Sequence, residues 1–353
     1  MPDELSPRRL RHRLVQLAVV AAVIAAAVAI SPGLGTLRTR LTHASAGWLI
    51  VGVASEFLSA VCYVVIFRAV FCARMSWRLA YQIGLAEQAA NSVFSASGAG
   101  GLALGAWALH RGGMSTEYIG RRTVAFFFLT SMANIGGVIL FAVLYATGLL
   151  GHDPDRALTY GFGGAATVAT LIVLALPALL RERVSESSVE KRSTRVAAAV
   201  RFIRHSVGQG VRDGLLLLRH RSPGVLIGSI GTMAFDLAVL GVSFRAFGYS
   251  PPLGVLVLGY LIGQLGGNLP IPGGIGGLDG GLIGAFALYH APLATTTAAV
   301  LAYHAISLWL PTILGSVAFV QLRNTLQRQA EPAVICMPLA DPIEAERPST
   351  TAR

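Results

Sequence analysis

The stretch Gly267-Asn-Leu-Pro-Ile-Pro-Gly-Gly-Ile-Gly-Gly-Leu-Asp279 interrupts an apolar region that runs from Leu253 to Tyr289. Glycine and proline both destabilise a helix interior, so no helix is expected to run straight through this stretch. In a membrane, lipid cannot satisfy the free N–H and C=O groups of broken backbone, which must be buried in protein or line a wet cavity. The sequence therefore predicts two half-helices in a re-entrant hairpin, joined by a structural turn of Pro270, Pro272, Gly273, Gly274, Gly276 and Gly277.

A second region of this kind lies earlier in the chain. Leu79–Leu109 is interrupted by Ser95-Ala-Ser-Gly-Ala-Gly-Gly101, which predicts another broken-helix hairpin. Its second leg contains Leu104-Gly-Ala-Trp-Ala-Leu-His110, which matches Ile283-Gly-Ala-Phe-Ala-Leu-Tyr289 of the later hairpin. These matches predict two related halves of the chain, at about 46–148 and 223–321.

The composition is that of a polytopic membrane protein. The 353 residues are 54% hydrophobic and only 13% charged, whereas a soluble domain carries about 25% charged residues. Apolar stretches long enough to cross a roughly 30 Å hydrocarbon core recur along the chain. We expect an all-α fold of about eight membrane segments, namely the two re-entrant hairpins and about six full spans. The expected spans are Leu14–Ile30, Ala46–Ala69, Thr123–Thr147, Ala157–Leu180, Pro223–Phe247 and Thr295–Gln321.

Arginine placement predicts the sidedness of these segments. The net charge is +11, and the segment Arg181–Arg221 alone holds ten Arg or Lys against four acidic residues. Basic loops mark the cytoplasmic face, so nucleic acid is not expected as a partner whereas membrane lipids are. We expect a cytoplasmic basic segment at 1–13, a membrane domain at 14–321 containing a cytoplasmic loop at 181–222, and a disordered cytoplasmic tail at 322–353. The expected location is the cell membrane, inner or plasma.

This topology predicts that the first hairpin enters from the cytoplasmic side and the second from the outside. The two halves would then form an inverted repeat, and inverted repeats with broken helices near the bilayer midplane are the recurring architecture of transporters.

Polar side chains gather in and beside the hairpins. Glu87 and Asn91 lie one helical turn apart and so share a face, and Gln264 and Asn268 repeat the spacing. A charge at mid-bilayer costs at least about 2.5–3.5 kcal/mol on insertion scales, so a concentration of such groups calls for a reason. The predicted substrate-binding set is Glu87, Asn91, Gln264, Asn268, Asp279 and His304.

Structural roles compete with this interpretation for several of these residues. The two asparagines and Asp279 fit equally well as ties across the broken turns, with Asp279 placed at the N-terminus of a helix, where a carboxylate is favoured. Glu87 has no evident capping role, which favours substrate binding over a structural role for this residue. His304 is isolated in the sequence, which favours an interhelical hydrogen bond over a proton relay.

Three further polar residues, Glu56, Asn134 and Asp236, lie within the other expected spans. We expect Glu56 to snorkel or to pair with a neighbouring helix. No Walker, Gly-x-Ser-x-Gly or His-Glu-x-x-His motif and no metal-ligand spacing occurs. No catalytic residue, cofactor or metal is therefore expected.

The run Gly267–Asp279, followed by Tyr303-His-Ala-Ile-Ser-Leu-Trp-Leu-Pro311 and Gly315, resembles the lysylphosphatidylglycerol synthase transmembrane family of flippase-like membrane proteins. The weaker elements of the first half also fit, and the resemblance covers roughly Leu14 to Arg323. The family usually carries Glu where this chain has Asp279 and Arg where it has His304. In the two-part synthases, the similar portion moves aminoacylated phosphatidylglycerol between leaflets, while a separate soluble domain makes the lipid. The resemblance therefore implies translocation without synthesis.

We expect a membrane transporter, in particular a translocase for a polar, aminoacylated or glycosylated lipid. Two alternatives remain open at this point. One is a non-catalytic membrane partner of a separately encoded lipid synthase or glycosyltransferase, and the other is a membrane-embedded transferase that uses these carboxylates as acid and base.

Overall fold

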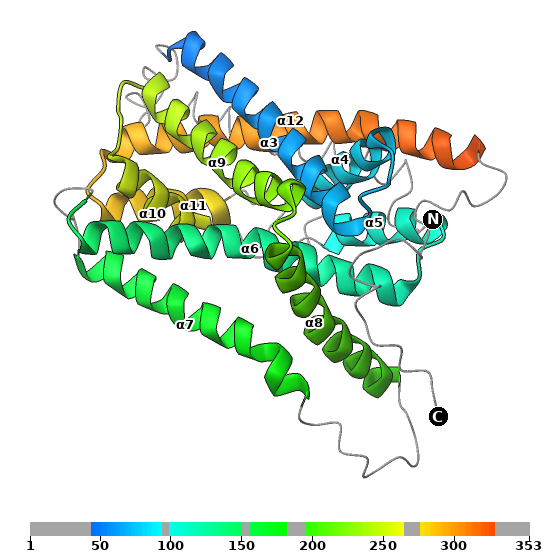
Figure 1. Cartoon of the computed structure of the whole chain (residues 1–353). Coiled ribbons are helices and arrows are strands. Elements are labelled where there is room, and N and C mark those ends of the chain that lie inside the picture. Colours follow the sequence, from blue (N-terminus) through cyan, green and yellow to red (C-terminus); the bar gives the residue numbers. More distant parts are fainter. Residues whose placement is uncertain (1–43, 94–98, 150–155, 182–194, 265–275, 329–353) are drawn as a thin grey trace.

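The computed structural model describes residues 44–93, 99–149, 156–181, 195–264 and 276–328, and these ranges form ten helices without a strand (Figure 1). The all-α fold expected from the sequence is therefore present in the described part of the chain. The helices are α3 (Ala46–Phe71), α4 (Trp77–Val93), α5 (Ala99–Arg111), α6 (Thr116–Ala146), α7 (Arg156–Arg181), α8 (Arg195–Arg219), α9 (Pro223–Ala246), α10 (Leu253–Gly263), α11 (Gly277–Leu288) and α12 (Leu293–Arg328).

Four of these helices, α3, α6, α9 and α12, are long and apolar enough to cross a membrane. Large apolar side chains such as Ile50, Ile227 and Val317 are exposed on them, as expected of helices that face lipid. Within α7 the apolar part that is described is shorter, Thr159–Ala175. The expected first span, Leu14–Ile30, lies outside the described residues.

Both interrupted regions form pairs of short helices, as the sequence predicts. The first pair is α4 and α5, and the second pair is α10 and α11, which have 11 and 12 residues. At 1.5 Å per residue, each helix of the second pair extends only about 17 Å, too short to cross a hydrocarbon core of about 30 Å.

Helices α3 and α9 form a close antiparallel pair, with the start of α3 beside the end of α9 (Figure 1). The backbone N–H of Ser45 donates to the carbonyl of Ala246 at 2.9 Å. Further along the pair, a Cβ at Gly228 would lie 2.5 Å from Ile66, and a Cβ at Gly231 would lie 2.5 Å from the sulfur of Cys62. These glycines are required because only a hydrogen side chain lets the two helix backbones approach this closely.

The other two long helices, α12 and α6, each pack antiparallel against one hairpin leg, α4 and α10 respectively. A Cβ at Gly315 of α12 would lie 2.1 Å from the carbonyl oxygen of Leu85 on α4, and Arg78 at the start of α4 lines one pocket together with Asn324 near the end of α12. Helix α10 packs on α6 in the same manner, because Gly254 contacts Tyr145 near the end of α6 while Leu261 lies near Gly137.

The segment 181–222, expected as a basic connection between spans, contains the 25-residue helix α8. Its apolar side packs on α6: a Cβ at Gly210 would lie 2.5 Å from Val124, and one at Gly214 would lie 2.5 Å from Phe128. The helix does not form an apolar span, because one face is basic and only the other is apolar. Near the C-terminus, α12 continues through Arg328 and so extends past residue 322, where the tail was expected to start.

Candidate functional site

Glu87 is buried inside the first hairpin, with 4% of the residue exposed. Its carboxylate is hydrogen-bonded to the hydroxyl of Tyr63 on α3. On the other side it lies against α5, where a Cβ at Gly105 would be only 2.7 Å from Glu87 Oε2. The absence of a side chain at Gly105 therefore makes the space that this carboxylate occupies.

Asn91 ties the two legs of the same hairpin together. Its side-chain oxygen accepts a hydrogen bond from the backbone N–H of Gly101 at 2.9 Å. Gly101 lies in the first turn of α5, whose N–H groups have no partner within their own helix. Asn91 thus caps α5 from the opposite leg, which is the structural role that the sequence left open for it.

Asp279 lies in the first turn of α11 and makes two contacts. Its Oδ2 accepts the backbone N–H of Gly276 at 3.2 Å, and Gly276 has a φ of 90°, a conformation that favours glycine. Its Oδ1 lies 2.5 Å from Nδ1 of His304 on α12. The carboxylate therefore holds the start of α11 and also joins it to α12, and His304 makes the interhelical hydrogen bond that its isolation in the sequence favours.

A further carboxylate, Asp236 in the middle of α9, is surrounded by tyrosines. Oδ2 of Asp236 accepts a hydrogen bond from the hydroxyl of Tyr303 at 3.1 Å and another from the hydroxyl of Tyr260. Tyr260 in turn is hydrogen-bonded to Gln264, a member of the predicted set, at the end of α10. Sequence reasoning left Asp236 out of the predicted set, although a charged residue in the middle of an apolar span was an available signal.

Glu56 of α3 lies opposite Asp236 of α9. The antiparallel contacts that pair Cys62 with Gly231 and Ser59 with Thr232 continue to this position, and the two carboxylates interact electrostatically. Glu56 is 5% exposed, so it does not snorkel, and its Oε2 is buried without a hydrogen-bond partner. Two carboxylates therefore face each other inside the α3–α9 pair.

The predicted residues that the structure describes fall into two groups along α12. The first hairpin packs against the C-terminal half of α12, where Gly315 meets Ala89 on α4. The second hairpin reaches the N-terminal half through Asp279 and His304. Gly315 and His304 are eleven positions apart, or about 16 Å along a helix axis. The hairpins thus approach the middle of α12 from its two ends.

Several predicted residues lie outside the described residues. These are Asn268 and four members of the structural turn, Pro270, Pro272, Gly273 and Gly274. Gly276 and Gly277 are described, and α11 begins at Gly277. Among the described residues, no group of three or more His, Cys, Asp or Glu side chains is placed to hold a metal ion.

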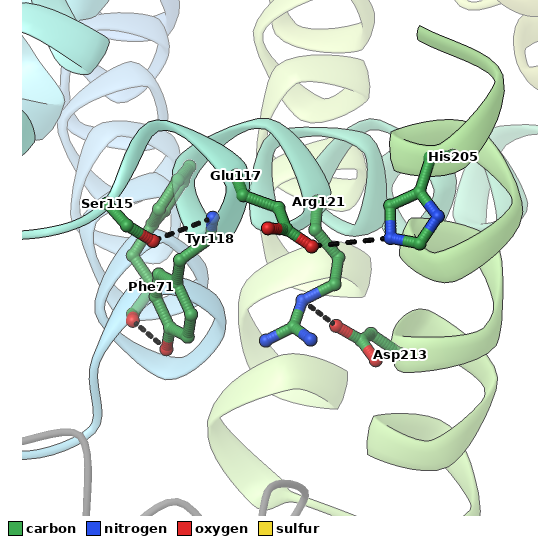
Figure 2. Close-up of polar contacts among 7 residues, drawn as sticks. All are labelled: Phe71, Ser115, Glu117, Tyr118, Arg121, His205 and Asp213. Atoms are coloured by element: carbon green, nitrogen blue, oxygen red, sulfur yellow. Dashed lines mark hydrogen bonds and ion pairs between the residues drawn. The ribbon is translucent and has the colours of Figure 1, made fainter. Parts of the chain in front are cut away.

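Sequence reasoning also missed a polar interface between α6 and α8, shown in Figure 2. Nε of Arg121 lies 2.9 Å from Oδ2 of Asp213, and their side chains are 7% and 1% exposed. In a second pair on the exposed side of the same interface, Nε2 of His205 lies 3.3 Å from Oε1 of Glu117 (Figure 2). The expected span starts at Thr123, after Arg121, but α6 already begins at Thr116, which places this arginine inside a helix.

The apolar long helices, the two helix hairpins and the buried carboxylates define a multi-pass membrane protein with acidic side chains in its interior. The family described as the lysylphosphatidylglycerol synthase TM region matches residues 13–315. This chain belongs to that family. No curated protein matches it.

Proposed function

We propose that this protein is a lipid translocase, which moves a polar headgroup between membrane leaflets along the carboxylates inside the helix bundle. The observation that carries the proposal is that each hairpin holds one carboxylate largely shielded from solvent: Glu87 in the first, 4% exposed, and Asp279 in the second, with 13% of its side chain exposed. Buried charge in a membrane is expensive, and it is characteristic of pathways for ions and polar substrates. The description of the family, which refers to a lipid synthase, is the reason for choosing a lipid as substrate.

The ligand class follows from the charge of these groups. Glu87 and Asp279 are acidic, and the Glu56–Asp236 pair adds two more carboxylates. In a region of low dielectric constant, such groups are stabilised by a positive charge or by hydroxyl donors. We infer that they receive a cationic or hydroxylated headgroup, such as an aminoacylated phospholipid or a glycolipid.

We further propose that 46–148 and 223–321 are inverted repeats. Each half has the order long, short, short and long: α3 to α6 in the first, and α9 to α12 in the second. The equivalent helices α3 and α9 run in opposite directions, as an inverted repeat requires. In addition, α4 of the first half packs antiparallel on α12 of the second half, and α10 of the second half packs antiparallel on α6 of the first. Each half therefore places one hairpin leg against a long helix of the other half. An internal duplication of opposite orientation supports alternating access to a central site.

The proposal is tested by replacing Glu87 with Gln and measuring transfer of a fluorescent aminoacylated phospholipid between leaflets of reconstituted vesicles. Glu87→Gln keeps the shape of the side chain and removes its charge, so transfer should be abolished while expression and thermal stability are retained. The matched control is Glu117→Gln, because Glu117 has an exposed carboxylate at the surface of α6.

Unchanged transfer in Glu87→Gln would remove this residue from the mechanism. Chemical turnover of a lipid substrate by the purified protein in detergent, where no second leaflet exists, would instead favour the membrane-embedded transferase. A requirement for a fixed copurifying protein would favour the partner-subunit alternative.

A further inference from the structure

A polar pocket lies between the first turns of α4 and the last turns of α12, on the N-terminal side of Glu87 along α4. Its volume is about 510 Å³. Besides one leucine, the pocket is lined by polar residues contributed by both helices and by the turn before α4, namely Ser76, Arg78, Gln82, Gln321, Asn324 and Thr325. Among the residues that the structure describes, no acidic side chain lines it.

Gln82 is the most informative residue of this pocket. It is fully buried, with 0% of the residue exposed, and neither its amide nitrogen nor its amide oxygen has a hydrogen-bond partner. A buried amide without partners costs roughly 1–3 kcal/mol, so such a group calls for an explanation. A ligand in the pocket that Gln82 lines would supply the missing partners.

The neighbouring residues place the pocket at the level of the lipid headgroups. Trp77 is 55% exposed, and the guanidinium of Arg68 lies 4.4 Å from the centre of its ring. Nε of Arg68 also donates to the carbonyl of Met75, which fixes the arginine at this turn. Exposed tryptophan and arginine at the end of an apolar span are typical of the membrane–water interface.

The lining has the chemistry of an anion site. Arg78 supplies a permanent positive charge and a planar set of donors suited to phosphate oxygens. The amides of Gln82, Gln321 and Asn324 and the two hydroxyls add neutral donors, which strengthen binding without adding charge. With a cation, several neutral donors and no acidic side chain among the described lining residues, the pocket favours an oxygen-rich anion over a cation.

We propose that this pocket binds a phosphate group at the interfacial end of α4, through Arg78 and the buried amide of Gln82. The phosphate of a phospholipid headgroup and free inorganic phosphate share this chemistry. The inference needs only the membrane location of the fold and does not depend on transport by Glu87, so the two proposals fail separately.

The experiment compares Gln82→Leu and Arg78→Gln with the unchanged chain. The purified full-length proteins are incubated with detergent micelles containing equal amounts of phosphatidylglycerol and diacylglycerol, and the retained lipid is identified by native mass spectrometry. Radiolabelled inorganic phosphate is measured in parallel by equilibrium dialysis. Arg74→Gln is the matched control, because Arg74 is an exposed arginine near the same turn that does not line the pocket.

We expect each pocket variant to lower phosphate-dependent retention by about tenfold, the cost of losing one strong hydrogen bond, while Arg74→Gln retains it. Selective retention of phosphatidylglycerol over diacylglycerol identifies the lipid as the source, and binding of inorganic phosphate alone identifies the free anion. Asn324→Leu, at an exposed position in the same lining, gives the same answer should Gln82→Leu fail to fold. The proposal would be overturned if Arg78→Gln and Asn324→Leu retained as much phosphatidylglycerol and as much inorganic phosphate as the unchanged chain.

Discussion

Nδ1 of His304 lies 2.5 Å from Oδ1 of Asp279, and this contact joins the first turn of α11 to the N-terminal half of α12. The same carboxylate accepts the N–H of Gly276 through its other oxygen. One side chain thus fixes both the start of a hairpin leg and its position against the long helix. A carboxylate with two structural partners is held in one orientation, as the proposed role of Asp279 in headgroup binding requires.

The first prediction concerns the strength of this contact. The single variants Asp279→Asn and His304→Gln and their double combination form a thermodynamic cycle. We expect a coupling energy of about 0.5–3 kcal/mol, because the two groups share one hydrogen bond. Thermal unfolding of the four purified proteins in one detergent measures it. Strictly additive destabilisation would mean that the contact does not contribute to stability.

The second prediction concerns the space beside Glu87. A methyl group at Gly105 would lie 2.7 Å from Oε2 of Glu87, so Gly105→Ala should push the carboxylate out of position without unfolding the hairpin. Because the group displaced is the end of a flexible side chain, we expect a loss of stability of no more than about 1–3 kcal/mol. Leaflet transfer should fall to the level expected for Glu87→Gln.

The control for this substitution is Gly136→Ala on α6, where a Cβ would have no neighbour within 4 Å. Transfer by Gly136→Ala should match the unchanged chain. Equal transfer by Gly105→Ala and Gly136→Ala would show that the exact place of the Glu87 carboxylate is unimportant.

The third prediction concerns the attachment of α8. Asp213→Leu leaves the buried guanidinium of Arg121 without this carboxylate, which should destabilise the protein by about 3–5 kcal/mol. Replacing both residues by leucine should recover a large part of that loss, since an apolar pair of similar size removes the uncompensated charge. Thermal unfolding checks both variants.

The nearby Glu117–His205 pair provides the comparison for this prediction. Its side chains are 67% and 56% exposed, so Glu117→Gln should change stability by less than about 1 kcal/mol. If Asp213→Leu proved as mild as Glu117→Gln, the buried pair would not hold α8 on α6.

The fourth prediction concerns the orientation of the hairpins. His110 lies in the last turn of α5, the second leg of the first hairpin, and Ser250 precedes α10, the first leg of the second. Single cysteines at these two exposed positions, in a chain whose native cysteines are replaced by serine, should react with a membrane-impermeant thiol reagent from opposite sides. Labelling of His110→Cys and Ser250→Cys from the same side would refute the inverted arrangement.

The sequence predicted the helix hairpins well because their signals are local. Proline and glycine interrupt helices wherever they occur, so the breaks after Val93 and Gly263 could be located without knowledge of the fold. The amphipathic helix α8 was missed because its net charge resembles that of a loop, and only packing against Val124 and Phe128 shows that one face is buried. Its ion pair was missed for the same reason, since Arg121 and Asp213 are far apart in the chain.

What the sequence alone determined is the class of protein: the composition, the apolar lengths and the broken turns require a polytopic helical membrane protein, because each follows from backbone and solvent chemistry at one place in the chain. Only the tertiary structure decided which polar groups meet. It set Asp279 against His304, surrounded Asp236 with Tyr260 and Tyr303, and left Glu56 opposite Asp236. The physical reason is that these contacts depend on how α3, α9 and α12 pack against one another. Glycines such as Gly228 and Gly231 set how closely the helices approach, and their contacts with the neighbouring helix form only in the folded protein.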